Sequence, residues 1–148
     1  MPYPQKPPLT DDELRMFLQE APIARLGTAN PDGTIHLSAL WFAYQDGDIV
    51  FGTQDITNKV RNIRQNPNVT VLIDVVGPPL QGVLIHGRAE LDYEDVIEKR
   101  IAIFEKYMPS EDAQGLAAML ADTWAPVVIR VKPERMTSYD YAKDGWLE

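Results

Sequence analysis

Two Asp-Gly turns constrain the fold of this chain most strongly. Asp32-Gly33 and Asp46-Gly47 each separate runs that are rich in β-branched and aromatic residues. Because glycine accepts the positive φ angles of tight turns, Asp-Gly between such runs predicts a β-hairpin. The sequence therefore predicts strands over Ile23–Thr28, Thr34–Tyr44 and Ile49–Thr53. Both alternating faces of Thr34–Tyr44 are largely apolar, so we expect both faces of that strand to be covered.

The order of helices and strands excludes a doubly wound parallel sheet. Thr10 and Glu13 form a capping box that predicts the start of an amphipathic helix. Strands that follow one another through short turns, with helices outside them, are typical of an antiparallel barrel. We therefore predict a mainly β fold of the α+β class, with two or three outer helices. The other predicted helices are Thr57–Gln65, Glu94–Tyr107 and Asp112–Ala121 with Ser110 as N-cap, and the other predicted strands are Val69–Asp74, Val83–Leu91, Val127–Val131 and Met136–Tyr141, with Pro133 in the last turn.

Length, charge and cysteine content narrow the function. The 148 residues fit one domain, which we place at residues 10–148 after a proline-rich leader at residues 1–9. A net charge of -8 argues against a nucleic-acid partner, because phosphate neutralisation needs a basic face. The chain contains no cysteine, which excludes disulfides and thiolate metal sites. The sequence shows no signal peptide and no apolar run near the ~20 residues that span a bilayer, so we expect a cytoplasmic protein without a membrane partner.

The segment that follows Thr53 carries the clearest candidate binding site. A predicted strand ends there, and a predicted helix begins at about Thr57 with free backbone amides on its first turn. Those amides, the hydroxyl of Thr57 and the charge of Lys59 together suit an anion, and a phosphate is the obvious guest. The local sequence equally allows Thr57 to be a simple N-cap, with Lys59, Arg61 and Arg64 on a solvated face.

Other chemistries have little support in the sequence. His36 and His86 are the only histidines, and neither has a partner at metal-ligand spacing. No nucleophile motif or glycine-rich phosphate loop is present, so we expect no catalytic side chain and no metal site. Tyr139 and Tyr141 alternate along the last predicted strand. They either line a substrate pocket or form an aromatic face packed on the barrel, and packing is the more common case.

Several short motifs follow one another between about Leu9 and Leu91. They are the capped helix, Ala-Arg-Leu-Gly-Thr, Pro-Asp-Gly, Ser-Ala-Leu-Trp-Phe, Asp-Gly, Ile-Val-Phe-Gly-Thr and Thr-Asn-Lys-Val-Arg-Asn-Ile-Arg-Gln-Asn-Pro. In order and spacing these motifs resemble the pyridoxamine 5'-phosphate oxidase-like superfamily. The resemblance implies an antiparallel split β-barrel that forms a homodimer and binds flavin mononucleotide (FMN) between its subunits.

The resemblance also implies which residues hold the cofactor. We expect an FMN-dependent oxidoreductase acting on a small organic substrate, in which the cofactor carries the redox chemistry. The matching positions fall into a phosphate group and a ring group. The phosphate group is Thr57, Asn58 and Lys59, and the ring group is Ser38, Ala39, Leu40 and Trp41, with Thr53 near the ring and the ribityl chain.

The chain departs from the oxidases that name the superfamily. Those oxidases have a Ser-Arg-Lys step in the phosphate loop, where this chain has Thr57-Asn58-Lys59, so one guanidinium is missing. Their carboxyl-terminal Arg-Leu segment for the substrate is also absent, and we expect an activity other than pyridoxamine phosphate oxidation. Two alternatives stay open. One is a reductase that uses the deazaflavin coenzyme F-420, whose anionic tail fits a net charge of -8 less well; the other is a protein that binds a flavin or another planar ligand without turnover.

Overall fold

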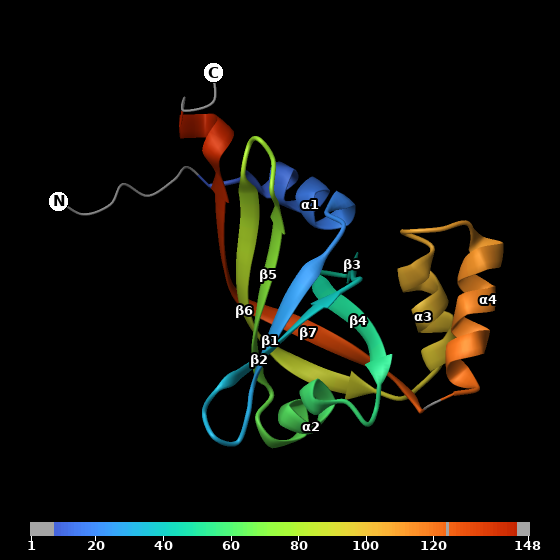
Figure 1. Cartoon of the computed structure of the whole chain (residues 1–148). Helices are drawn as coiled ribbons and strands as arrows, with labels where there is room; N and C mark the ends of the chain where they lie inside the picture. The colour runs from blue at the N-terminus through green and yellow to red at the C-terminus, as the bar shows by residue number, and fades with distance from the viewer. Residues whose placement is uncertain (1–7, 124, 145–148) are drawn as a thin grey trace.

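Seven antiparallel strands form one sheet that curls into a half-barrel, as the sequence predicts (Figure 1). The computed structural model describes residues 8–123 and 125–144. The strands lie in the order β2-β1-β5-β6-β7-β4-β3. Their bounds are β1 Ala24–Ala29, β2 Ile35–Leu40, β3 Ala43–Gln45, β4 Asp48–Gln54, β5 Asn68–Val75, β6 Gln81–Asp92 and β7 Pro126–Asp140.

The predicted single strand Thr34–Tyr44 is wrong, because the chain breaks it at Trp41 and Phe42. β2 pairs with β1 at one edge of the sheet, whereas β3 pairs with β4 at the other edge. The residues from the end of β2 to the start of β3 span at most about 10 Å. The two edges must therefore approach each other at this crossover, and that approach closes the curled sheet.

The expectation that both faces of this segment are covered is also wrong for the single chain. The side chains of Ile35 and Leu37 on β2 are 60% and 70% exposed. β2 is an edge strand, and no helix of the described part of the chain packs on its outer face. The outer face of β2 is therefore an exposed apolar surface.

The two predicted strands at the carboxyl end form one continuous strand, β7. Pro133 lies within it and pairs with Gly87, next to a register shift between His86 and Gly87. The ladder between β7 and β4 ends at Val131, so Pro133 has β6 alone as a paired neighbour. Proline lacks an amide proton but is tolerated where one side of a strand is unpaired or at a bulge. The prediction of a turn at Pro133 is wrong for this reason.

Four α-helices and one 3-10 helix complete the fold. The predicted capping box of Thr10 and Glu13 is confirmed at the start of the first helix. Ser110 is not an N-cap; it is the first residue of its helix, follows Pro109, and donates its hydroxyl to Glu105. The helices are α1 Asp11–Glu20, α2 Asn58–Gln65, α3 Val96–Phe104, α4 Ser110–Ala121 and the 3-10 helix Tyr141–Asp144.

The helices bury two separate apolar cores. α1 and α2 lie at opposite ends of the barrel and pack against its interior, whereas α3 and α4 lie side by side outside β4 and β7 (Figure 1). Phe51 of β4 faces the barrel interior, and Val50 faces α3 and α4. β4 is therefore buried on both faces. No helix of the described part of the chain is long and apolar enough to cross a bilayer.

We expect Gly87→Ala to lower the free energy of unfolding by about 1–3 kcal/mol, because it overpacks the bulge. A Cβ at position 87 would lie 2.6 Å from the carbonyl oxygen of Lys132 and 2.9 Å from a methyl of Val131. Gly115→Ala is the control, since nothing lies within 4 Å of its Cβ position on α4. Gly115→Ala should raise the free energy of unfolding by about 0.5–1 kcal/mol, because alanine favours the helix more than glycine does. Urea denaturation measures both, and equal midpoints would contradict the bulge argument.

Candidate cofactor site

The start of α2 presents backbone amides without acceptors, as the sequence predicts. The helical ladder begins with the amide of Arg61, which donates to the carbonyl oxygen of Thr57 at 3.1 Å. Within the described part of the chain, the amides of residues 58, 59 and 60 have no hydrogen-bond acceptor. Thr57 is the N-cap but its side chain caps nothing; its hydroxyl donates to the carbonyl oxygen of Gln54 at 2.9 Å. The amides supply anion donors here, while the hydroxyl proton is already used.

Lys59 lies on the first turn of α2 and is the cation nearest in the chain to these free amides. Its side chain is half-buried, and it forms no ion pair or hydrogen bond with any described residue. Burial lowers the pKa of its ammonium group below the usual value, because desolvation penalises the charged form. Asn58 beside it is exposed. A half-buried ammonium beside free amides is a favourable place for an anion.

The two arginines of α2 differ from Lys59 and from each other. Arg64 forms an ion pair with Asp55, and it also donates to the hydroxyl of Tyr93 at 2.6 Å. The Tyr93 hydroxyl in turn donates to Asp55 at 2.8 Å. Arg64 is therefore committed to fixing the loop before α2. Arg61 is exposed and has no side-chain partner among the described residues.

Buried contacts hold α2 in position against the barrel. Val60 and Ile63 pack into the barrel core. The buried amide of Asn62 donates to Thr28 at 3.1 Å and to Asn30 at 2.8 Å, both near the end of β1. The start of α2 is thus fixed relative to the strands, and an anion site there is preorganised.

The predicted ring residues lie at the end of β2 and in the crossover. Ala39, Leu40 and Trp41 line a hollow of about 330 Å³ between the sheet and the helices α3 and α4. Gly52 of β4 and Arg100 of α3 line the same space, which we call the Arg100 hollow. Its other walls are apolar side chains from the two helices, among them Phe104, Leu116 and Leu120.

The remaining two predicted residues do not line this hollow. The hydroxyl of Ser38 is half-buried and lies 3.2 Å from Nε2 of His36 on the same strand. Thr53 is buried near the end of β4, and strand alternation places it with Phe51 on the face opposite Gly52. β4 connects the two halves of the candidate site, because it runs from Gly52 at the hollow to the loop before α2.

Trp41 and Phe104, which both line the Arg100 hollow, form an aromatic cluster with Tyr107. The Trp41 indole stacks on Tyr107 at 4.6 Å and meets Phe104 edge-on at 6.0 Å. The Tyr107 hydroxyl accepts the Phe42 amide at 3.1 Å and donates to the Phe42 carbonyl oxygen at 3.2 Å. These bonds tie the turn after α3 to the crossover and fix the indole.

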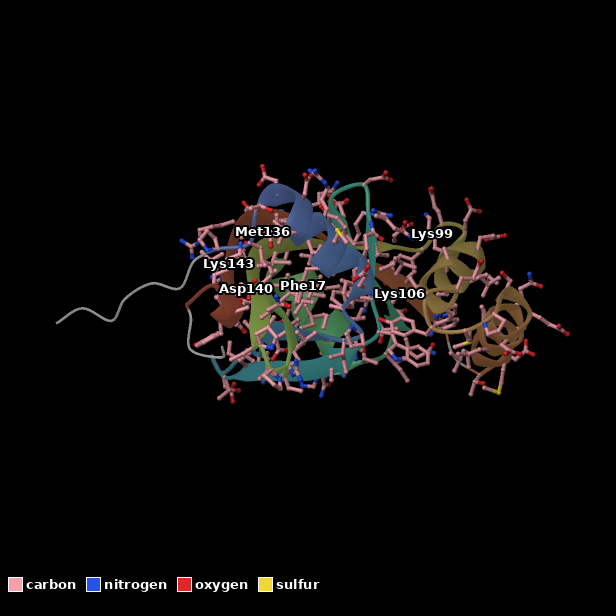
Figure 2. The ribbon with its side chains drawn as sticks, turned by 90° about the horizontal axis from the view of Figure 1, so that it is seen from above. Phe17, Lys99, Lys106, Met136, Asp140 and Lys143 are labelled. Atoms are coloured by element: carbon pink, nitrogen blue, oxygen red, sulfur yellow. The ribbon has the colours of Figure 1, made fainter. Side chains whose placement is uncertain are left out.

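Lys106 lies next to the same aromatic cluster. Its ammonium lies 3.6 Å from the centre of the Phe42 ring and donates to the carbonyl oxygen of Ala21 at 2.7 Å. Figure 2 shows Lys106 between the strands of the barrel and the helix pair. Burial lowers the pKa of Lys106 to about 8.

The other polar and aromatic candidates have structural contacts. His86 lies within hydrogen-bond distance of the Thr70 hydroxyl, at 3.3 Å. Tyr139 and Tyr141 meet edge-on at 5.8 Å, and neither lines the Arg100 hollow. Among the residues that the structure describes, no three or more metal-ligating side chains gather.

Sequence reasoning missed Arg100, Gly52 and the aromatic partners of Trp41. One signal was available for Arg100. It follows Val96 by four residues and precedes Phe104 by four, so it falls on the apolar face of its helix. A charged residue on a buried face is unusual and marks a candidate site.

Comparison with known proteins decides the family. A family model described as "Pyridoxamine 5'-phosphate oxidase" matches residues 10–138. The chain belongs to this family. No curated protein matches the chain. Family membership establishes the fold. Members of one fold family can differ in activity, so the activity has to be argued from the site.

Three solved structures illustrate that diversity. A conserved hypothetical protein, Rv2991, from Mycobacterium tuberculosis is similar at 26% identity and a TM-score of 0.83, over 95% of this chain and 90% of that one. A protein named F420 reductase has 22% identity and a TM-score of 0.65, over 82% and 94%. HutZ, described as the heme storage protein from Vibrio cholerae, has 18% identity and a TM-score of 0.68, over 85% and 92%. The last two likenesses show the fold alone.

We expect Lys106 to make stability rise with pH. In the unfolded chain a lysine titrates near ~10.4, whereas folded Lys106 loses its proton at about 8. Between these values the unfolded chain holds more protons, so the free energy of unfolding rises from about pH 8 to about pH 10. Lys106→Met should reduce this rise, whereas Lys132→Met, at an exposed position, should keep it. Urea midpoints at both ends of the window measure the effect, and an unchanged rise in Lys106→Met would contradict it.

Proposed function

We propose that this protein is an FMN-binding oxidoreductase that acts as a homodimer on a small organic substrate. The observation that carries the proposal is the unpaired, half-buried ammonium of Lys59 beside three free amides at the start of α2. The chain has 22 acidic residues, yet no described carboxylate pairs with Lys59. A phosphate there would pair the ammonium and satisfy the amides at once.

The positions of the ring residues are compatible with a cofactor whose phosphate lies at Lys59. Thr57 at the helix is five positions after Gly52 at the hollow, so the two are at most about 17 Å apart. This span is on the scale of one flavin mononucleotide, with its phosphate at Lys59 and its ring along Ala39 to Trp41. Thr53 lies between these ends of the span. When bound, the flavin supplies the redox chemistry, and the residues of this chain bind and orient it.

A deazaflavin reductase is the second candidate. The structure named F420 reductase shares this fold. Arg61 is exposed two residues beyond Lys59 on α2, and its unpaired charge would suit the anionic tail of coenzyme F-420. The third candidate is a protein that holds a flavin or another planar ligand without turnover, and the likeness to a heme storage protein favours it. In all three candidate functions the start of α2 holds an anion, and the candidates differ only in which anion that is.

The exposed face of β2 supports the homodimer. Ile35 and Leu37 project apolar side chains from it, and a second hollow of about 370 Å³ lies beside them, lined also by Gly27 and Leu72. Monomeric proteins rarely expose contiguous apolar surface of this kind, so we expect a second copy of the chain to cover it.

In keeping with the sequence, we also propose that the protein is cytoplasmic.

The absorption spectrum of the purified protein, with and without added cofactor, tests the proposal most directly. We expect an FMN spectrum. A deazaflavin spectrum would assign the second candidate, and a protein that takes up neither cofactor would overturn both. Stopped-flow mixing of the FMN-loaded protein with NADH or NADPH then separates an oxidoreductase from a binding protein, because a flavin that is never reduced supports the latter.

Lys59→Ala should weaken FMN binding by about 1.5–3 kcal/mol, or about ten- to a hundred-fold in Kd, because a hydrogen bond to a charged group is lost. Arg61→Ala is the matched control: it removes one exposed charge from the same helix and should change the Kd much less. Fluorescence titration of FMN measures both variants. Equal loss in the two variants would indicate general electrostatics instead of a phosphate contact at Lys59.

Leu37→Glu should convert the protein from dimer to monomer, since it places a charge in the apolar face of β2. Met119→Glu is the control, because Met119 is similarly exposed, at 59%, but lies on α4. Light scattering coupled to gel filtration gives the mass of each variant. A wild-type monomer, or a dimer that survives Leu37→Glu, would place the interface elsewhere.

A further inference from the structure

Arg100 is a buried guanidinium with no hydrogen-bond acceptor and no ion-pair partner among the described residues, and its guanidinium carbon lies 5.7 Å from the centre of the Phe104 ring. Its side chain lies on α3 and is 4% exposed. Its Nε and Nη1 atoms are buried and have no hydrogen-bond acceptor. Basic residues nearby in the chain do find partners: Lys99 on α3 pairs with Asp92, and Lys106 in the turn after α3 donates to the carbonyl oxygen of Ala21. An unpaired buried charge is strongly unfavourable, so a fold that retains one has a further use for it.

Gly52 makes room for this guanidinium against β4. A Cβ at position 52 would lie 3.0 Å from Nε of Arg100 and 3.2 Å from its Cγ. The buried side-chain oxygen of Gln54, on the same face of β4, is an acceptor that also has no partner. The two groups do not satisfy each other in this structure.

The hollow in front of Arg100 has the composition of a site for an apolar ligand with one charge. Of the described residues that line it, Arg100 alone is charged. The aromatic side chains of Trp41 and Phe104 line it, as do Leu116 and Leu120 of α4. The volume of about 330 Å³ falls in the range of small-molecule sites. Trp41 is 43% exposed, so a large aromatic surface is available to a ligand.

The single guanidinium and the apolar lining of the Arg100 hollow favour a carboxylate over a phosphate. The planar guanidinium matches the two oxygens of a carboxylate. A doubly charged phosphate would bring a second negative charge into an apolar space where no other cation faces it. A single carboxylate on an apolar body leaves no charge unpaired.

We propose that the Arg100 hollow binds the carboxylate of a small, largely apolar organic acid, and that such acids are the substrate class of this protein. The second part rests on the proposed function, because Ala39, Leu40 and Trp41 serve both the ring of the cofactor and the hollow. The first part stands without any cofactor.

Calorimetric titration of the cofactor-free protein tests the binding. Benzoate is the probe, and benzamide is its neutral counterpart of the same shape. We expect benzoate to bind about ten-fold or more tightly than benzamide, because the bond to a charged group is lost in benzamide. No measurable benzoate binding, or equal binding of the two, overturns the proposal. Inorganic phosphate should not displace benzoate, and displacement would overturn the assignment to a monoanion.

Comparing Arg100→Met with Arg88→Met distinguishes the loss of the Arg100 guanidinium from the loss of one positive charge in general. Both remove one positive charge, but Arg88 is exposed on β6 and does not line the hollow. Arg100→Met should lose benzoate affinity by about ten-fold or more, and Arg88→Met should keep it. The thermal midpoint gives a second readout, since replacing an unpaired buried charge with a packed apolar residue should not lower it. A lower midpoint with unchanged benzoate affinity would show that Arg100 is structural and overturn the proposal.

Gly52→Ala keeps the charge and displaces the guanidinium instead. It should also weaken benzoate binding, and it keeps the proposal testable if Arg100→Met fails to fold. Repeating the titration on FMN-loaded protein tests the second part. Benzoate binding that persists supports a substrate beside the ring, whereas loss of binding on FMN loading overturns the substrate assignment. Failure to take up FMN overturns the proposed function and leaves the result on cofactor-free protein intact.

Discussion

The crossover of Trp41 and Phe42 is the constraint on which the rest of the structure depends. The chain passes from one edge of the sheet to the other in two residues, so the sheet has to curl until its edges approach. Tyr107 binds both backbone groups of Phe42 and thereby attaches the turn after α3 to the point of closure. The same contact presents the Trp41 indole to the Arg100 hollow. Barrel closure and the shape of the candidate site are therefore consequences of one connection.

Two cations kept apart from carboxylates define the polar part of the site. The chain has 22 acidic residues against 14 basic ones, so an acidic partner would be easy to supply. Several other basic residues take one: Arg64 pairs with Asp55, and Lys143 with Glu13. Lys59 and Arg100 do not, although burial lowers the pKa of both. An anionic ligand at either group would offset its unfavourable desolvation, and this is the physical basis for proposing ligands at both places.

The family fold hosts proteins with different named roles, including an F420 reductase and a heme storage protein. What this chain shares with them is the fold. The groups of this chain that can select a ligand are side chains of the candidate site, such as the Arg100 guanidinium over Gly52 and the aromatic ring of Trp41. Function in such a family follows from those side chains, because the backbone alone selects no ligand.

The sequence by itself determined the local elements, including the start of α2, where we propose that a phosphate binds. The capping box at Thr10, the Asp-Gly hairpins and the start of α2 all depend on residues a few positions apart, so local chemistry predicts them. Only the tertiary structure decided the break at Trp41, the bulge that carries Pro133 and the pairing of Gly52 with Arg100. Each of these brings together residues distant in the chain, and their geometry follows from sheet closure and helix packing, which no local pattern encodes.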